Sequence, residues 1–236
     1  MIEVATDPRI CARLDDGLEK PALVWSWPSA VRCISTAPLG GGIGERVWVV
    51  NAEVPSSYAR RDPDAHLMEV SASLGLFGTG VGMLTAADVR RVTSAFEHGA
   101  RVWATVGLGH PVLAAGASDG ELHLRDATQG SAISEVGTLE VGTLEVGTIN
   151  VVAVLPVRLS DAALVNAVST ITEAKVQALY DSGLEATGTA TDAICVACDP
   201  DAESVCFAGP RSQWGSRLAR AAHGAILHGA SEWTKG

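Results

Sequence analysis

The sequence of 236 residues has no long apolar run, no surplus of basic charge and no visible targeting segment. No apolar stretch reaches the roughly 18–20 residues that a membrane-spanning helix requires. The 27 acidic residues outnumber the 17 basic ones, so the chain lacks the basic surplus that neutralises nucleic-acid phosphates. Its first residues lack the basic segment and apolar stretch of a secretory signal. We therefore expect a cytoplasmic protein that binds neither a membrane nor nucleic acid.

Motifs of several common enzyme classes are also absent from the sequence. The six histidines show no HExxH spacing, and the glycine-rich stretch 36–45 has no P-loop lysine. Cys195 and Cys198 form a CVAC motif without a second pair, and strand alternation predicts that they point to opposite faces. We interpret both as buried structural cysteines and expect no metal site.

The composition is that of a folded protein with a substantial core. Hydrophobic residues make up 47% of the chain and charged residues 19%, which excludes a disordered protein. The length favours one domain or two small ones. We predict an N-terminal extension over residues 1–21 and a single domain over 22–230, and the many small apolar residues suggest a homodimer.

Two stretches about 100 residues apart repeat the order strand, helix, glycine-rich turn and strand. The predicted elements are 46–55, 63–76 and 77–84 in the first copy, and 148–157, 160–184 and 186–197 in the second. Such self-similarity is typical of two copies of one supersecondary unit packed together. We predict an α/β fold in which two related strand–helix–strand halves form mixed sheets with outer helices. A layered αββα sandwich is the more specific alternative.

Local patterns predict the other elements. The stretch 22–34 is rich in Val, Trp and Ile and is expected to form two strands broken near Pro28. Amphipathic spacing predicts a helix over 85–99, with Thr85 as its N-cap and Gly99 at its end.

Two further helices follow from the same rules. The helix over 160–184 has Ser160 or Asp161 as N-cap and ends at Gly183, and a last helix covers 216–230. The stretch 135–150 contains an EVGTL tandem, which we interpret as an expansion of a loop or hairpin.

A few polar residues stand in positions where chemistry is plausible. Glu173 and Lys175 are about 200° apart on the predicted helix, so one of them leaves the solvent face unless both are simply solvated. Asp192 lies at a threonine-rich turn that enters an apolar strand, where turn chemistry is the simpler interpretation. Asn51 and Asn150 lie in apolar strands and need partners, so each is a structural tie or a ligand contact.

Several strings, taken together and in order, resemble one family over most of residues 30–228. They are GVGMLTAADV (80–89), ATVGLG (104–109), GTINVVAVL (147–155), SDAALVNAVSTITEAKVQAL (160–179), TGTATDAICVA (187–197) and FAGPRSQWGSRLARAAHGAI (207–226). They are similar to those of the CbiZ-type adenosylcobinamide amidohydrolases of corrinoid salvage.

The resemblance implies a hydrolase that cleaves a linear amide of a corrinoid. The bond joins the propionyl side chain of the corrin ring to aminopropanol, and the products are adenosylcobyric acid and 1-amino-2-propanol. The corrinoid is then the substrate, and no cofactor is expected. The alternatives are a non-catalytic corrinoid-binding salvage protein and an amidohydrolase of another amide.

For this reaction we expect three catalytic residues, Glu173, Lys175 and Asp192. Glu173 activates a water, and Lys175, Asn150 or backbone amides near Gly188 stabilise the oxyanion. Asp192 orients a threonine or the leaving amine. The alternative is a hydroxyl nucleophile, from Thr148, Thr189 or Thr191, that forms an acyl-enzyme. The expected substrate-binding residues are Thr36, Asn51, Thr85, Thr148, Asn150, Gly188, Thr189 and Thr191.

Overall fold

The computed structural model describes residues 7–15, 17–116 and 147–235. Its helices are α1 (Pro63–Ser73), α2 (Asp161–Asp181) and α3 (Gln213–Trp233), with a 3-10 turn η1 (Val89–Arg91). Its strands are β1 (Arg9–Asp15), β2 (Leu18–Ser35), β3 (Gly42–Glu53), β4 (Gly80–Thr85), β5 (Thr93–Glu97), β6 (Ala100–Gly107), β7 (Pro111–Val112), β8 (Thr148–Leu155), β9 (Arg158–Leu159), β10 (Gly188–Thr189), β11 (Ala193–Cys198) and β12 (Ser204–Val205).

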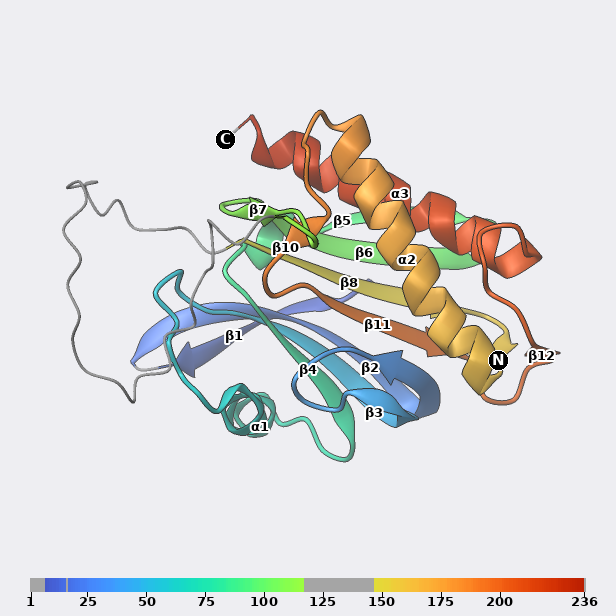
Figure 1. Cartoon of the computed structure of the whole chain (residues 1–236). Helices are drawn as coiled ribbons and strands as arrows, with labels where there is room; N and C mark the ends of the chain where they lie inside the picture. Colours follow the sequence, from blue (N-terminus) through green and yellow to red (C-terminus); the bar gives the residue numbers. More distant parts are fainter. Residues whose placement is uncertain (1–6, 16, 117–146, 236) are drawn as a thin grey trace.

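Eight of these strands form one mixed sheet that folds over itself. The order is β4-β3-β2-β11-β8-β6-β5, and β1 pairs with β2. Figure 1 shows a first half, made of β1 to β4, facing a second half, made of β5, β6, β8 and β11. Trp25 and Trp103 meet edge to face between the halves, with ring centroids 5.9 Å apart. This folded sheet is the centre of a layered α/β sandwich.

The stretch 22–34 is one strand, so the predicted pair of strands was wrong. β2 runs through Pro28, which lies where the register with β3 shifts between Ser26 and Val31. Proline has no N–H to donate, and a β-bulge tolerates it without ending the strand. β1 and the start of β2, which fall in the predicted N-terminal extension, are part of the sheet.

The two predicted strand–helix–strand halves are confirmed. β3 and β4 pair in parallel around α1, and β8 and β11 pair in parallel around α2. A parallel pair needs a crossover connection, which each helix supplies on an outer face of the sandwich. Figure 1 shows α1 on the outside of the first half, and α2 and α3 on the outside of the second.

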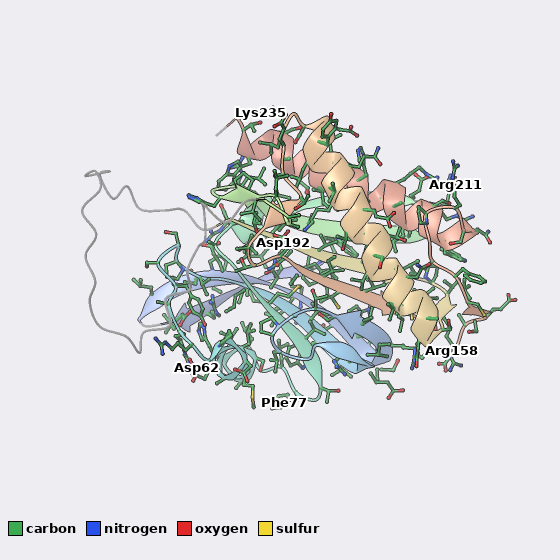
Figure 2. The ribbon with its side chains drawn as sticks, in the orientation of Figure 1. Asp62, Phe77, Arg158, Asp192, Arg211 and Lys235 are labelled. Carbon is green, nitrogen blue, oxygen red and sulfur yellow. The ribbon has the colours of Figure 1, made fainter. Side chains whose placement is uncertain are left out.

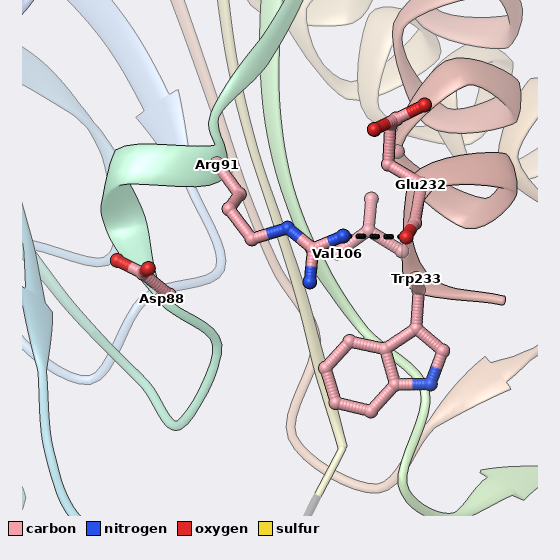
Figure 3. A pocket seen from close by; sticks show the side chains of 6 residues that line it. Asp88, Arg91, Val106, Glu232 and Trp233 are labelled. Carbon is pink, nitrogen blue, oxygen red and sulfur yellow. Dashed lines mark hydrogen bonds between the residues drawn. The ribbon is translucent and has the colours of Figure 1, made fainter. Parts of the chain in front are cut away.

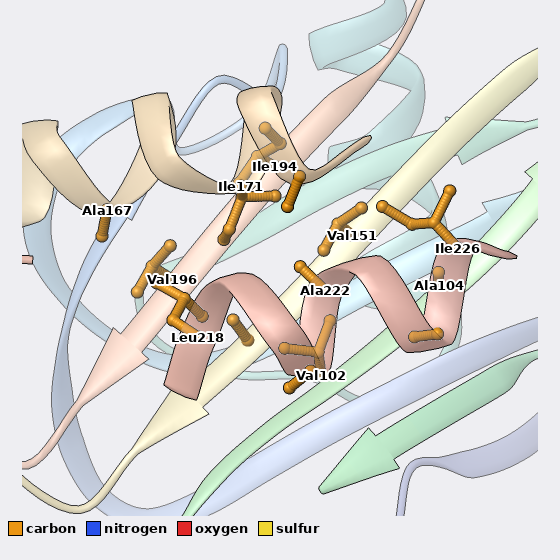
Figure 4. Close-up of a cluster of buried hydrophobic side chains, with 14 of the residues drawn as sticks. Val102, Ala104, Val151, Ala167, Ile171, Ile194, Val196, Leu218, Ala222 and Ile226 are labelled. Carbon is orange, nitrogen blue, oxygen red and sulfur yellow. The ribbon is translucent and has the colours of Figure 1, made fainter. Parts of the chain in front are cut away.

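Successive side chains along each strand point to opposite faces of the sheet, and this divides the core into layers. In β8, Val151 points toward α2 and α3, whereas its neighbour Val152 points into the space between the sheet halves. Figure 4 shows the outer cluster of the second half, where Ile171 of α2 and Leu218 of α3 pack over the strands. A smaller cluster joins Leu67 of α1 to the first half.

The ends of α2 follow the sequence rules. Ser160 is the N-cap, since its hydroxyl accepts a hydrogen bond from the N–H of Ala163 at 3.2 Å. Gly183, just beyond the helix, has a φ of 85°, which a glycine adopts without strain. The last helix is also confirmed, but α3 is longer than predicted, because it already begins at Gln213.

The predicted helix over 85–99 was wrong. Thr85 ends β4, and η1 and β5 occupy the stretch that follows. His98 and Gly99 have φ values of 44° and 97°, and they connect β5 to β6 as a two-residue hairpin turn. Two successive positive φ values fit a primed hairpin turn and cannot continue a helix. Gly99 is therefore a turn residue and not a helix stop.

The EVGTL tandem lies almost entirely outside the described residues, which resume at Gly147. In the part of the chain that the structure describes, no helix is both long and apolar enough to cross a membrane.

Candidate functional site

A buried ion pair joins α2 to the turn before β11. Lys175 lies on the inward face of α2, and its Nζ donates a hydrogen bond to Oδ2 of Asp192. The two side chains are only 9% and 11% exposed. Figure 2 labels Asp192 near the middle of the view, beside α2. A buried ion pair offsets its desolvation cost only when its remaining polar atoms are also hydrogen-bonded.

The Asp192 carboxylate meets this condition. Its Oδ1 accepts hydrogen bonds from the Thr189 hydroxyl and from the Ile149 N–H at 2.9 Å, and its Oδ2 accepts from the Thr189 N–H at 3.1 Å. The carboxylate therefore connects α2, β10 and the start of β8. A Cβ at Gly188 would collide with both Asp192 and Lys175, so glycine leaves the room that the pair needs.

Two threonine hydroxyls lie beside this pair. The Oγ1 atoms of Thr148 and Thr191 are 2.8 Å apart, and Thr191 Oγ1 donates to the carbonyl oxygen of Gly147 at 3.3 Å. A hydroxyl has one proton, so Thr148 is then the donor to Thr191. Thr148 is buried and Thr191 is exposed. The two hydroxyls thus form a chain from the interior to the solvent.

Asn51 and Asn150 bond to each other across the two sheet halves. Asn150 Nδ2 donates to Asn51 Oδ1 and to the carbonyl oxygen of Leu84, both at 2.8 Å. Asn51 Nδ2 donates to Thr105 Oγ1 at 2.9 Å, and Asn150 Oδ1 accepts from the Ala193 N–H at 3.1 Å. These bonds engage both side-chain amides, so the geometry favours a structural tie over a ligand contact.

Thr36 and Thr85 cap the strand ends near this network. Thr36 Oγ1 accepts from the Ile194 N–H at 3.0 Å, and Thr85 Oγ1 accepts from the Ala87 N–H at 3.1 Å. Thr36 is exposed, whereas Thr85 is buried. Both therefore lie at the end of the sandwich that carries the threonines and Asp192.

Glu173 lies elsewhere. It is exposed and lines a groove of about 270 Å³ between α2 and α3, with Gln177 and His223 among the other lining residues. Lys175 is about 200° away around the helix and is the one that turns inward. The structure therefore brings Lys175, Asp192 and the threonines together, but it does not bring Glu173 to them.

Two groups that hydrogen-bond to these residues were not identified from the sequence. Thr105 is a polar residue inside the apolar strand β6, the same signal that drew attention to Asn51 and Asn150. The carbonyl oxygen of Gly147 accepts from Thr191, which nothing in the sequence indicates because the contact joins segments 44 residues apart.

The buried cysteines behave as packing residues. Cys195 points between the sheet halves and Cys198 toward the helices, as predicted. A hydrogen bond with Cys195, together with burial, raises the pKa of the Cys33 thiol, and burial raises that of Cys198 to about 11. Since the thiolate is the nucleophilic form, neither Cys33 nor Cys198 is activated.

Other features of the described residues offer no competing centre. No group of three or more His, Cys, Asp or Glu side chains in the described ranges could hold a metal ion. The small pocket of about 50 Å³ in Figure 3 is lined by Asp88, Arg91 and Trp233 among others, and Arg91 there bonds to the Glu232 carbonyl. Ligand sites of small molecules measure roughly 300–1,000 Å³, so this pocket holds no substrate.

Comparison with known proteins adds the family to this geometry. The CbiZ family, described as adenosylcobinamide amidohydrolase, matches residues 7–236. The chain belongs to this family. A curated relative from Methanosarcina mazei, named adenosylcobinamide amidohydrolase, is 26% identical over 192 residues, which cover 78% of this chain and 82% of the relative. Membership of the CbiZ family makes the chain a hydrolase that acts on an amide, and it confirms the resemblance found in the sequence.

Proposed function

We propose that this CbiZ-family protein hydrolyses the aminopropanol amide of adenosylcobinamide to adenosylcobyric acid and 1-amino-2-propanol. The observation that carries the proposal is the Thr148 hydroxyl. It is buried at one end of the sandwich, donates to a second hydroxyl, and lies next to the residue whose N–H binds Asp192. An amide hydrolase needs a nucleophile, either a water or a side-chain hydroxyl, and the buried Thr148 hydroxyl is the candidate that this arrangement favours.

Amide hydrolysis also requires a path for protons and a donor to the carbonyl oxygen. In the proposed mechanism Thr148 Oγ attacks the amide carbon, its proton passes through the Thr191 hydroxyl to the leaving amine, and water then hydrolyses the acyl-enzyme. Lys175 and Asp192 act as positioning residues, because their pair holds Thr189 and the start of β8 in place. In this proposal the hydroxyls of Thr36 and Thr191, both exposed residues, bind peripheral amides of the corrinoid.

The placement of Glu173 supports the hydroxyl route over the water route. Its exposed carboxylate lines the groove between α2 and α3, whereas Lys175 and Asp192 are buried together. If Glu173 were the base, Glu173→Gln would abolish turnover. We expect Glu173→Gln to retain turnover within about twofold, and Thr148→Ala to lose it by about 10³-fold or more.

The decisive assay incubates purified full-length protein with adenosylcobinamide and follows adenosylcobyric acid by chromatography and mass. Thr172→Ala is the matched control, because Thr172 is an exposed threonine on α2 that bonds only within its own helix in the described structure. Binding without release of the acid would favour a salvage-binding protein. Hydrolysis of simple amides with no corrinoid turnover would favour another substrate.

Three sequence predictions accompany this proposal without a test in the structure. They are a cytoplasmic location, a homodimer and the absence of a cofactor.

A further inference from the structure

The peptide bond between Gly147 and Thr148 lies inside the hydroxyl chain described above. Thr148 is the first residue of β8, so the carbonyl carbon of Gly147 is the acyl carbon nearest to its hydroxyl along the chain. The Thr191 hydroxyl contacts both sides of this bond, since it accepts from Thr148 Oγ1 at 2.8 Å and donates to the Gly147 carbonyl oxygen at 3.3 Å. A hydroxyl in this position polarises the carbonyl and accepts the proton of the attacking oxygen.

The backbone around this bond is tightly confined. A Cβ at Gly147 would lie 2.7 Å from the carbonyl oxygen of Gly107 and 3.0 Å from Cγ2 of Thr189. On its other side, Ile149 N–H is fixed by the Asp192 carboxylate. The bond is thus held between two anchored segments, and holding reacting groups in one geometry lowers the barrier of a reaction between them.

We propose that the chain cleaves its own Gly147–Thr148 peptide bond. Thr148 Oγ attacks the Gly147 carbonyl carbon, the new C–O bond forms, and the C–N bond breaks as the Thr148 nitrogen takes up the proton relayed through Thr191. One water then hydrolyses the resulting ester. The products are a chain that ends in the carboxylate of Gly147 and a chain that begins with the free amine of Thr148.

The cleavage would complete the hydrolytic site. In the described structure, the hydrogen-bond partner of the Thr148 hydroxyl is another hydroxyl, which is a weak base. Cleavage places a free α-amino group two bonds from the carbon that carries the Thr148 hydroxyl. An N-terminal amine is an effective base for a threonine nucleophile. The self-cleavage needs no corrinoid, so it can be tested independently of the proposed function.

The sequence repeats the residues around the proposed cleavage bond, and the other copies serve as internal controls. The tripeptide Val-Gly-Thr occurs at 136–138, 141–143 and 146–148. The first two copies lie outside the described residues, whereas in the third Gly147 and Thr148 have the contacts given above. If local sequence alone caused cleavage, all three Gly–Thr bonds would be cut. Cleavage after Gly147 alone is expected if the folded site is responsible.

The test measures the mass of the purified full-length protein under denaturing conditions, without corrinoid, over increasing incubation times. We expect two polypeptides, residues 1–147 and 148–236, whose masses sum to the intact chain plus one water, with Thr148 as the new N-terminus. A rate independent of protein concentration would mark the reaction as intramolecular. A chain that stays intact throughout would overturn the proposal, as would a cut after Gly137 or Gly142.

Variants separate self-cleavage from a contaminating protease. Thr148→Ala should remain intact, Thr148→Ser should still be cut because it keeps the hydroxyl, and Thr191→Val should be cut about 10²-fold more slowly. Thr138→Ala and Thr143→Ala should be cut like wild type. Cleavage of Thr148→Ala at the same bond would refute the proposal. A chain that cuts itself but leaves adenosylcobinamide unchanged would refute only the proposed function.

Discussion

The two strand–helix–strand units share one topology but differ in chemistry where they face each other. In register, Asn51 of the first unit lies opposite Met83, and Asn150 of the second lies opposite Ala193. Each asparagine thus lies opposite a buried apolar residue of the parallel partner strand, and the two asparagines bond to each other. Their hydrogen bond joins the two sheet halves.

The positions around each asparagine differ between the units. Two residues before it, the first unit has the buried Val49 and the second has Thr148. One residue before its strand partner, the first unit has Gly82, which packs against Leu67 of α1, and the second has Asp192, which binds Lys175 of α2. The first unit is thus an apolar scaffold at the places where the second carries its reactive groups.

The largest expected effect is on turnover, and it comes from replacing Thr148 of the second unit by valine, the residue that the first unit has at position 49. Thr148→Val keeps the shape of the side chain and removes the hydroxyl, so turnover of adenosylcobinamide should fall by about 10³-fold or more. The reciprocal variant Val49→Thr should remain active but lose about 1–3 kcal/mol of stability, because it buries a hydroxyl without a partner. Turnover assays and urea unfolding measure the two effects. A Thr148→Val protein with normal turnover would remove the distinction between the units.

Breaking the ion pair of the second unit should cost stability. Asp192→Asn leaves the Lys175 ammonium buried without a counter-charge, at a cost of about 3–5 kcal/mol in the free energy of unfolding. The double variant with Lys175→Met should recover most of that loss, because it removes the unpaired buried charge. Urea denaturation midpoints test both statements. A loss below about 1 kcal/mol in Asp192→Asn would show that the pair is not a structural anchor.

The asparagine tie should give smaller losses of unequal size. Asn150→Ala removes three hydrogen bonds and Asn51→Ala removes two, so each should cost about 1–3 kcal/mol, with Asn150→Ala the more costly. Because the two side chains bond to each other, the double variant should deviate from additivity by about 0.5 kcal/mol or more. A double-mutant cycle in urea is the measurement, and strict additivity would argue against the tie.

The smallest expected effect concerns the helix starts. The Ser160 hydroxyl caps α2, whereas Asp62 at the start of α1 makes no side-chain cap bond. Ser160→Ala should therefore cost about 1 kcal/mol, and Asp62→Ala should cost less. Thermal unfolding of the two variants tests the ranking. Equal shifts would mean that the two units do not differ at their helix caps.

Periodicity and caps predicted the parts of the fold whose signals are local. Leu164, Ile171 and Leu179 repeat at helical spacing, and all three are fully buried in α2. The same spacing failed at 85–99, because the two positive φ values of His98 and Gly99 make a hairpin turn that a helical pattern does not reveal.

The sequence indicated which types of residue form the candidate site, but not which individual residues come together there. The spacing of Glu173 and Lys175 showed that one of them had to leave the solvent face. Packing of α2 on β11 and β8 decided that Lys175 does, since that face also carries Ile171. The contact between Thr191 and Gly147 had no signal at all, because it depends on where a turn meets the start of a distant strand.

By itself, the sequence determined the two repeated units, the long helix with its Ser160 cap, the buried cysteines and the family. These follow from short-range spacing and residue chemistry, which act within a few turns or strands. The tertiary structure alone decided that the sheet folds over, that Asn51 meets Asn150, and that Thr148, Thr191 and Asp192 gather at one end. The residues in those contacts are up to about a hundred positions apart in the sequence. They reach hydrogen-bond distance only because the two sheet halves pack together, and no local sequence pattern encodes that packing.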